Sequence, residues 1–340
     1  MKKFTFLTEE QCRGKEHREE TMTDYSVVLG GRCPENLLKD KSKQMLGRYW
    51  LKTPEKIQWW DDQEVQMQIA GKRETIEGAE ITDSGIGAKP VLHFDSLNDI
   101  PTNGELPKRT ENGVLEVEYG HYPQTAPNKA IQEELEDLFA QNKLKQTKNI
   151  YMTYLKALDD SNELYHEPNI DLEYEFNGKR YVRTKAKPDY EYFNLSEGDF
   201  TYEKDDYVWI EVEPIKWLID EEQKFMITDK IIFAGIEFDD PSKFNKSYLY
   251  KDYLSHDYFC KDVEQYFEGT SINKFMNNCW AKDILQINKE KETKQKTHSS
   301  EELKSFARQG EKKYTQIGQG YRSYIQETKK DQKRDDGARQ

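Results

Sequence analysis

The sequence predicts an α+β fold in which a mixed or antiparallel sheet is flanked by a few helices. Three stretches predict it: a run of β-branched and aromatic residues from Tyr207 to Phe238, an Asn177-Gly178 turn between two alternating segments, and a helical apolar stripe from Thr270 to Leu285. The first of these is the longest apolar run, so we expect it to form a central buried hairpin.

Within that run, Val208, Ile210 and Val212 alternate at the two-residue period of a strand. A polar turn, DEEQK, separates them from a second apolar set: Phe225, Ile227, Ile231 and Phe233. This pattern predicts two antiparallel strands joined by a short turn.

Residues 1–94 read as a β-rich segment with little helix. A short strand is expected at FTFL (4–7), then an exposed helix capped by Thr8, and a strand YWLKTP (49–54) that Pro54 ends or places at an edge. Further short strands are expected where Val65, Met67 and Ile69 alternate, around Gly78, Gly85 and Gly87, and in GAKPVLHF (87–94).

Residues 95–112 have the composition of a linker, with two prolines and one Asn-Gly. A strand is expected from Val114 to Tyr119, and Gly120 and Pro123 are expected to break it.

An α+β segment, 113–287, would hold the rest of the fold. Asn128 is expected to cap a helix whose apolar face is formed by Ile131, Leu135, Leu138 and Phe139. Because Asn-Gly tolerates the positive φ of a type I′ turn, a tight hairpin is expected at Asn177-Gly178. The helix of 270–285 would bury one stripe of residues: Ile272, Phe275, Met276, Cys279, Trp280 and Ile284.

Residues 288–340 read as a basic tail. A capping box at Ser299 and Glu302 predicts a short helix, and the last residues are expected to be disordered. From Asn288 onward the chain has 14 Lys and Arg against 9 Asp and Glu, a net charge of +5. Because the whole chain has a net charge of −13, the residues before Asn288 have a net charge of −18.

The acidic body disfavours binding to nucleic acid and to anionic membranes, and it favours a protein partner with a basic surface. Solubility is the alternative role for this charge. No CxxC pair is formed by the four cysteines, which are Cys12, Cys33, Cys260 and Cys279. The sequence shows no segment with the pattern of a signal peptide, and it has no apolar run long enough to cross a bilayer. We therefore expect a cytoplasmic protein with reduced thiols and no membrane contact.

No catalytic motif, metal site or cofactor is expected. His256 and Cys260 are the only pair with ligand spacing, and Gly85 and Gly87 lack the helix and Lys-Ser/Thr pair of a phosphate loop. An enzyme site assembled from distant segments stays open as an alternative. The candidate partner-binding residues are aromatic and acidic: Trp59, Trp60, Asp61, Asp62, Tyr202, Asp205 and Asp206.

Three strings, VEYGHYPQT (117–125), VEPIKWLIDEEQKFMITDKIIF (212–233) and SINKFMNNCWAKDI (271–284), resemble the first half of a bacterial domain of unknown function that is common in Firmicutes and their phages. FTFLTEEQ (4–11), YWLKTP (49–54) and GAKPVLHF (87–94) are similar to the later elements of the same family. The halves therefore stand in swapped order here, as in a circular permutation or in two incomplete copies. Lys52 and Lys89 occupy positions where the family usually has Arg.

The resemblance implies a fold akin to C-type lectins and formylglycine-generating enzymes. The paired catalytic cysteines of those enzymes have no counterpart here, so it implies a binding scaffold and not an oxidase. The leading hypothesis is a non-enzymatic binding protein for a protein or carbohydrate. The alternatives are a phage or mobile-element inhibitor of a host nucleic-acid-dependent defence protein, and an enzyme.

Overall fold

The computed structural model describes residues 3–13, 21–32, 47–54, 66–70, 76–81, 83–158, 164–187, 193–194, 201–239 and 267–284. The chain divides into two compact units, Met1–Lys289 and Glu290–Gln340. All described residues belong to the first unit, so the tail and the helix expected at Ser299 lie outside them.

The fold is α+β with mostly antiparallel sheets, as predicted. An eight-stranded sheet contains β4 to β9, β12 and β13, and two small sheets are formed by β1-β2-β3 and β10-β11. The strands of the large sheet are β4 (Val91–His93), β5 (Lys108–Arg109), β6 (Leu115–Thr125), β7 (Lys145–Leu158), β8 (Leu164–Phe176), β9 (Lys179–Lys185), β12 (Tyr207–Asp220) and β13 (Phe225–Thr228).

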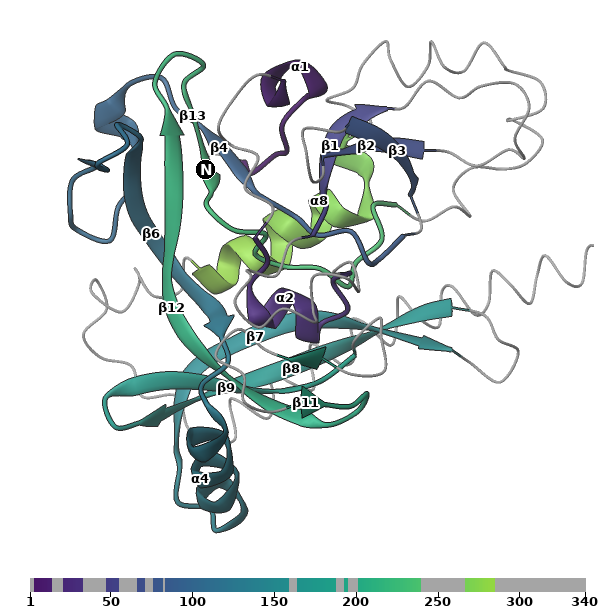
Figure 1. Ribbon diagram of the computed structural model, residues 1–340, viewed down its shortest axis with the longest axis vertical. Coiled ribbons are helices and arrows are strands. Elements are labelled where there is room, and N and C mark those ends of the chain that lie inside the picture. Colours follow the sequence, from purple (N-terminus) through teal and green to yellow (C-terminus); the bar gives the residue numbers. More distant parts are fainter. Residues whose placement is uncertain are drawn as a thin grey trace, which may run out of the picture. The chain divides into compact units, whose positions relative to one another are not determined.

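Strand β12 is the centre of the large sheet, and the sheet branches beside it. One edge of β12 pairs with β6. The other edge pairs first with β9, through residues 207–211, and then with β13, through residues 217–220. Figure 1 shows the consequence: β7, β8 and β9 run across the direction of β6 and of the second half of β12. On the branched edge, residues 212–216 of β12 have no strand partner among the described residues.

Strand β6 is longer than predicted, because Gly120 and Pro123 do not break it. Two bulges absorb them: β6 has an extra residue between the pairs Pro214–His121 and Lys216–Glu118, and another between Glu211–Thr125 and Val212–Pro123. Gly120 has a φ of +72°, which a bulge accommodates at low cost in glycine.

Both predicted hairpins are confirmed, although the second strand of the central one ends at Thr228, so that Ile231 and Phe233 lie beyond it in isolated bridges. The central one is β12–β13, and Asn177 and Gly178 join β8 to β9 with φ values of +50° and +75°, as a type I′ turn requires.

The N-terminal meander is also confirmed, as β1 (Tyr49–Pro54), β2 (Gln66–Ala70) and β3 (Ile76–Glu80) in an antiparallel sheet. Strand β4 instead joins the large sheet through β13, and the expected FTFL strand is reduced to one bridge between Thr5 and Val91. Residues 95–112 contribute a 3-10 turn (Leu97–Asp99) and β5, which pairs with β6.

Two of the described helical segments are long, α4 (Lys129–Ala140) and the continuous run 271–284, and the other described helices are short. Thr8 caps α1 (Glu9–Cys12), and α4 begins after Asn128 as predicted. The helix expected from Thr270 to Leu285 is confirmed: α8 (Ser271–Phe275) continues as one π turn, η6 (Met276–Trp280), and then as α-helix to residue 284. The sequence did not predict α2 (Asp24–Val28), because five residues are too few to show a helical period.

One hydrophobic core draws on both the N-terminal and the central segments. Trp280 is fully buried, and its ring lies 5.0 Å from that of Phe4, 5.7 Å from Phe233 and 6.4 Å from Trp217. A second, smaller cluster lies under α4, where Leu135 packs with Tyr181 and Trp209.

Candidate functional site

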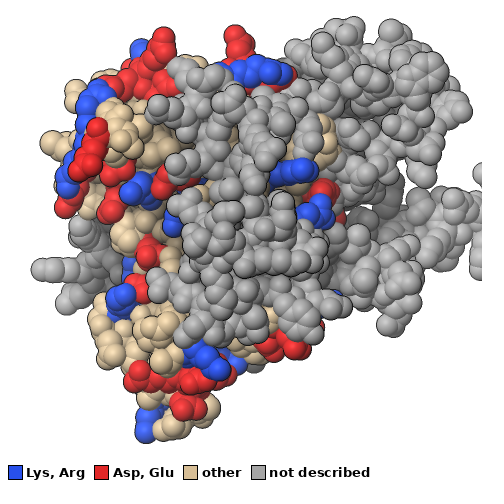
Figure 2. Space-filling view, in the orientation of Figure 1, with Lys and Arg blue, Asp and Glu red and all other residues tan. Residues whose placement is uncertain are grey.

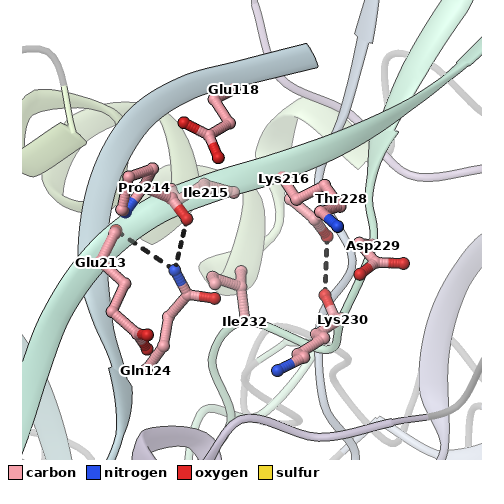
Figure 3. Close-up of a pocket in the computed structure, with 10 residues that line it drawn as sticks. All are labelled: Glu118, Gln124, Glu213, Pro214, Ile215, Lys216, Thr228, Asp229, Lys230 and Ile232. Atoms are coloured by element: carbon pink, nitrogen blue, oxygen red, sulfur yellow. Dashed lines mark hydrogen bonds between the residues drawn. The ribbon is translucent and has the colours of Figure 1, made fainter. Parts of the chain in front are cut away.

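A hollow of about 240 Å³ lies beside β12 where the sheet branches. Its walls are the bulged part of β6, the unpartnered stretch of β12 and the segment that follows β13 (Figure 3). The lining residues are Glu118, Gln124, Glu213, Pro214, Ile215, Lys216, Thr228, Asp229, Lys230 and Ile232.

The second β6 bulge places Gln124 at the hollow, since Gln124 is the extra residue between Pro123 and Thr125. Its Nε2 donates to the backbone oxygens of Glu213, at 3.2 Å, and Pro214, at 2.8 Å. The side chain is 8% exposed, and its Oε1 accepts no hydrogen bond from the described residues. In Figure 3 this oxygen turns toward Ile232, on the opposite wall. Gln124 is thus a fixed acceptor facing the hollow.

Three carboxylates line the same space: Glu118, Glu213 and Asp229. None of them forms an ion pair with a described residue. Of the two lysines, Lys216 pairs with Glu116 at 3.6 Å, and Lys230 is half-buried. The lining therefore carries an excess of negative charge.

The wall after β13 is held in place by its own hydrogen bonds. The Thr228 hydroxyl donates to the Lys230 oxygen at 2.9 Å, and the Asp229 N–H donates to the Lys216 oxygen at 2.9 Å. The buried Lys89 donates its Nζ to the Asp229 oxygen at 3.0 Å. The segment that carries Asp229 is thereby anchored to β12 and to Lys89.

A second polar cluster lies in the core, around Glu173 on β8. The Glu173 carboxylate is fully buried and accepts hydrogen bonds from Thr147 at 2.9 Å, from Asn149 at 3.0 Å and from Tyr151 at 2.6 Å, with Arg180 at 3.6 Å. Thr147 and Asn149 come from the irregular part of β7, between its pairs at Gln146 and Ile150, Tyr151 follows directly after it, and Arg180 lies on β9. Glu173 is saturated with donors, so it fixes the β7 irregularity and has little capacity left for a ligand.

Next to it, the Tyr25 hydroxyl donates to Asp171 at 2.8 Å, and Asp283 accepts from the Met152 N–H at 3.2 Å. Burial raises the pKa of Asp283 and that of Tyr122, whose ring lies 5.5 Å from that of Tyr25. None of these residues lines the hollow. The cluster contains titratable groups of the kind used in catalysis, but it is enclosed by the core.

The structure locates part of the sequence-predicted site. Trp59, Trp60, Asp61 and Asp62 lie outside the described residues. Tyr202 is buried, on the two-residue strand β11 (Thr201–Tyr202) that pairs with β10 (Phe193–Asn194).

Asp205 and Asp206 are exposed in the turn before β12. Asp205 is bridged by Lys185 at 3.0 Å and Lys187 at 2.7 Å, which lower its pKa, and Asp206 accepts from the Glu203 N–H at 2.8 Å. The structure does not bring these residues to the hollow.

Sequence reasoning missed Gln124 and the hollow. The available signal was the pair of prolines, Pro123 and Pro214, in two strands that face each other: each lacks a backbone donor, and so each predicts a bulge or an unpaired edge. The point at which β12 changes partner from β9 to β13 has no local signature.

Three further findings concern metal sites, membrane spans and similarity to known proteins. Within the described residues, no group of three His, Cys, Asp or Glu side chains could hold a metal ion. None of the described helices has the length and apolar character needed to cross a membrane. No protein-family model, curated protein or solved structure matches this chain.

Proposed function

We propose that this chain is a non-enzymatic, cytoplasmic binding protein that recognises a protein partner with a basic surface, and that the hollow beside β12 is part of the contact. One observation carries the proposal: Glu118, Glu213 and Asp229 line a single hollow without an ion pair to a described residue, around the fixed acceptor Gln124. Unpaired carboxylates on a rigid wall are suited to a cationic group.

The charge of the chain supports the same partner. The total is −13, and Figure 2 shows acidic side chains distributed among basic ones over the described surface. A negative body accelerates encounter with a basic protein and slows encounter with nucleic acid.

The resemblance to the Firmicutes and phage family supports a scaffold role. We propose a C-type-lectin-like arrangement with its halves in swapped order, in which β4 from the N-terminal half completes the sheet by pairing with β13. A scaffold of this kind presents loops, so residues 59–62 and the turn at Asp205 and Asp206 remain proposed additional contacts.

The test compares two doubly neutralised variants of the full chain. One is Glu213→Gln with Asp229→Asn, in the hollow. The matched control is Glu134→Gln with Asp137→Asn, which removes the same charge from exposed positions on α4. Binding to immobilised basic peptides is followed by biolayer interferometry at about 0.1 M and about 1 M salt, where the Debye length falls from about 10 Å to about 3 Å.

The proposal predicts that the hollow variant weakens binding by about tenfold or more, that the α4 variant changes it by less than about threefold, and that the association rate falls with salt. Equal losses in the two variants would mean that only net charge matters. Undetectable binding of basic peptides to the wild-type chain would overturn the proposal.

A further inference from the structure

We infer that the group received by the hollow is the guanidinium of an arginine side chain of the partner protein. The inference rests on the proposed function, because it takes the hollow as a contact site and specifies the chemistry that the site selects.

The first argument is a comparison of two buried glutamines that both reach β12. Gln132, on α4, uses both ends of its side chain within the protein: Nε2 donates to the Trp209 oxygen at 2.7 Å, and Oε1 accepts from the Trp209 N–H at 2.8 Å. Gln124 is equally buried and equally anchored through Nε2, but its Oε1 has no donor among the described residues. This oxygen is not among the fully buried side-chain atoms of the described residues that lack a partner, so it is accessible from the hollow and can accept from a group that enters it.

The second argument is the arrangement of the acceptors. Oxygens of Gln124, Glu213 and Asp229 come from β6, from β12 and from the segment after β13. The three carboxylates of the lining do not form a group that could hold a metal ion. Guanidinium presents five N–H donors in one plane and can serve acceptors in different directions, whereas ammonium is a compact and strongly hydrated point charge.

The third argument is the hydrophobic part of the lining. Ile215 and Ile232 are each 1% exposed and contribute to the inner surface of the hollow. The methylene stem of arginine packs on such a surface while its head reaches polar groups. A space of about 240 Å³ is below the usual range for small-molecule pockets and suits a single long side chain.

The charge balance favours a monovalent cation. Lys216 is engaged by Glu116, so Lys230 alone opposes the three carboxylates of the lining. Lys230 is then the one group of the lining that repels arginine, and its removal should tighten binding.

The experiment measures binding of three soluble peptides to the full chain by calorimetry: Ser-Gly-Xaa-Gly-Ser with Xaa as arginine, lysine or citrulline, the neutral analogue of arginine. The chains are wild type, Gln124→Met, the matched control Gln132→Met and Lys230→Gln, each checked for folding by its melting temperature. We expect the arginine peptide to bind at least tenfold more tightly than the other two. Gln124→Met should abolish that preference, Gln132→Met should retain it in the folded fraction, and Lys230→Gln should increase affinity for arginine.

The outcomes separate the inference from the proposed function. Equal binding of arginine and lysine peptides, reduced in the Glu213→Gln, Asp229→Asn variant, keeps the proposed function and overturns the arginine inference. No binding of either peptide overturns both. Free arginine amide binding as tightly as the peptide would make the hollow a small-molecule site and overturn the assignment to a partner protein. Lys230→Gln without tighter binding, or Gln124→Met with the preference intact, would also overturn the inference.

Discussion

The Asn103 side chain holds both backbone groups of Gly120 at the first β6 bulge. Its Oδ1 accepts from the Gly120 N–H at 2.8 Å, and its Nδ2 donates to the Gly120 oxygen at 3.2 Å. Asn103 therefore takes the place of a strand partner where the ladder is interrupted, and strand β6 continues to the hollow.

Replacing Asn103 by Ala should destabilise the protein by about 1–3 kcal/mol, because it leaves a buried N–H and a buried carbonyl unsatisfied. The free energy of unfolding is measured by urea denaturation. Asn98→Ala, at an exposed position in the neighbouring 3-10 turn, is the control and should change stability by less than about 0.5 kcal/mol. Equal effects of the two changes would show that the Asn103 bonds contribute nothing.

Trp280→Ala should cost about 3–5 kcal/mol, since it removes a fully buried ring that packs against Phe4, Phe233 and Trp217. The control is Leu106→Ala, at a side chain that is 82% exposed. A loss below about 1 kcal/mol for Trp280→Ala would place α8 and η6 at the surface of the core.

The buried carboxyl of Asp283 should make stability depend on pH. Burial raises its folded-state pKa above the ordinary 3.8, so its contribution is fully present below that value and is lost as the pH rises through the folded pKa. Asp283→Asn keeps an oxygen for the Met152 N–H and cannot ionise. We expect the variant to gain stability relative to wild type between about pH 4 and pH 8.

Chemical denaturation across this pH range checks the prediction for Asp283. Leu106→Ala, at a side chain that is 82% exposed and does not ionise, is the control and should leave the pH dependence unchanged. A wild-type curve that runs parallel to that of Asp283→Asn would contradict the role of burial.

Gly178→Ala should cost about 1–2 kcal/mol because the type I′ turn requires a φ of +75° there. Gly269→Ala is the matched control: an added Cβ meets nothing within 4 Å at either position, and Gly269 has no positive φ in the strained range. Similar melting temperatures for the two variants would argue against the hairpin turn.

The elements that could be predicted are those with a local signature. The β8–β9 hairpin follows from Asn177-Gly178, and α4 and α8 follow from their caps and apolar stripes. Strand β6 was predicted too short because its first bulge, at Gly120, is stabilised by Asn103, a residue in a segment whose composition is that of a linker.

The candidate site could not be predicted for a related reason. Gln124 lies at the hollow because β6 bulges beside the stretch where β12 changes partner from β9 to β13. The β12–β13 hairpin was predicted, but the point at which β12 changes partner was not. Composition indicated the sign of the charge and thus the kind of partner, but it gave no position for the contact.

The most direct test of the central claim is to locate binding in solution through the side-chain amide signal of Gln124, assigned with the Gln124→Met variant. The arginine peptide is titrated into the isotope-labelled full chain at about 0.1 M salt and again at about 1 M. We predict a saturable shift of the Gln124 signal, with that of Gln132 unchanged, and a weaker effect at the higher salt. Saturable binding that leaves the Gln124 signal in place, or that moves the signals of α4 instead, would contradict recognition through the hollow.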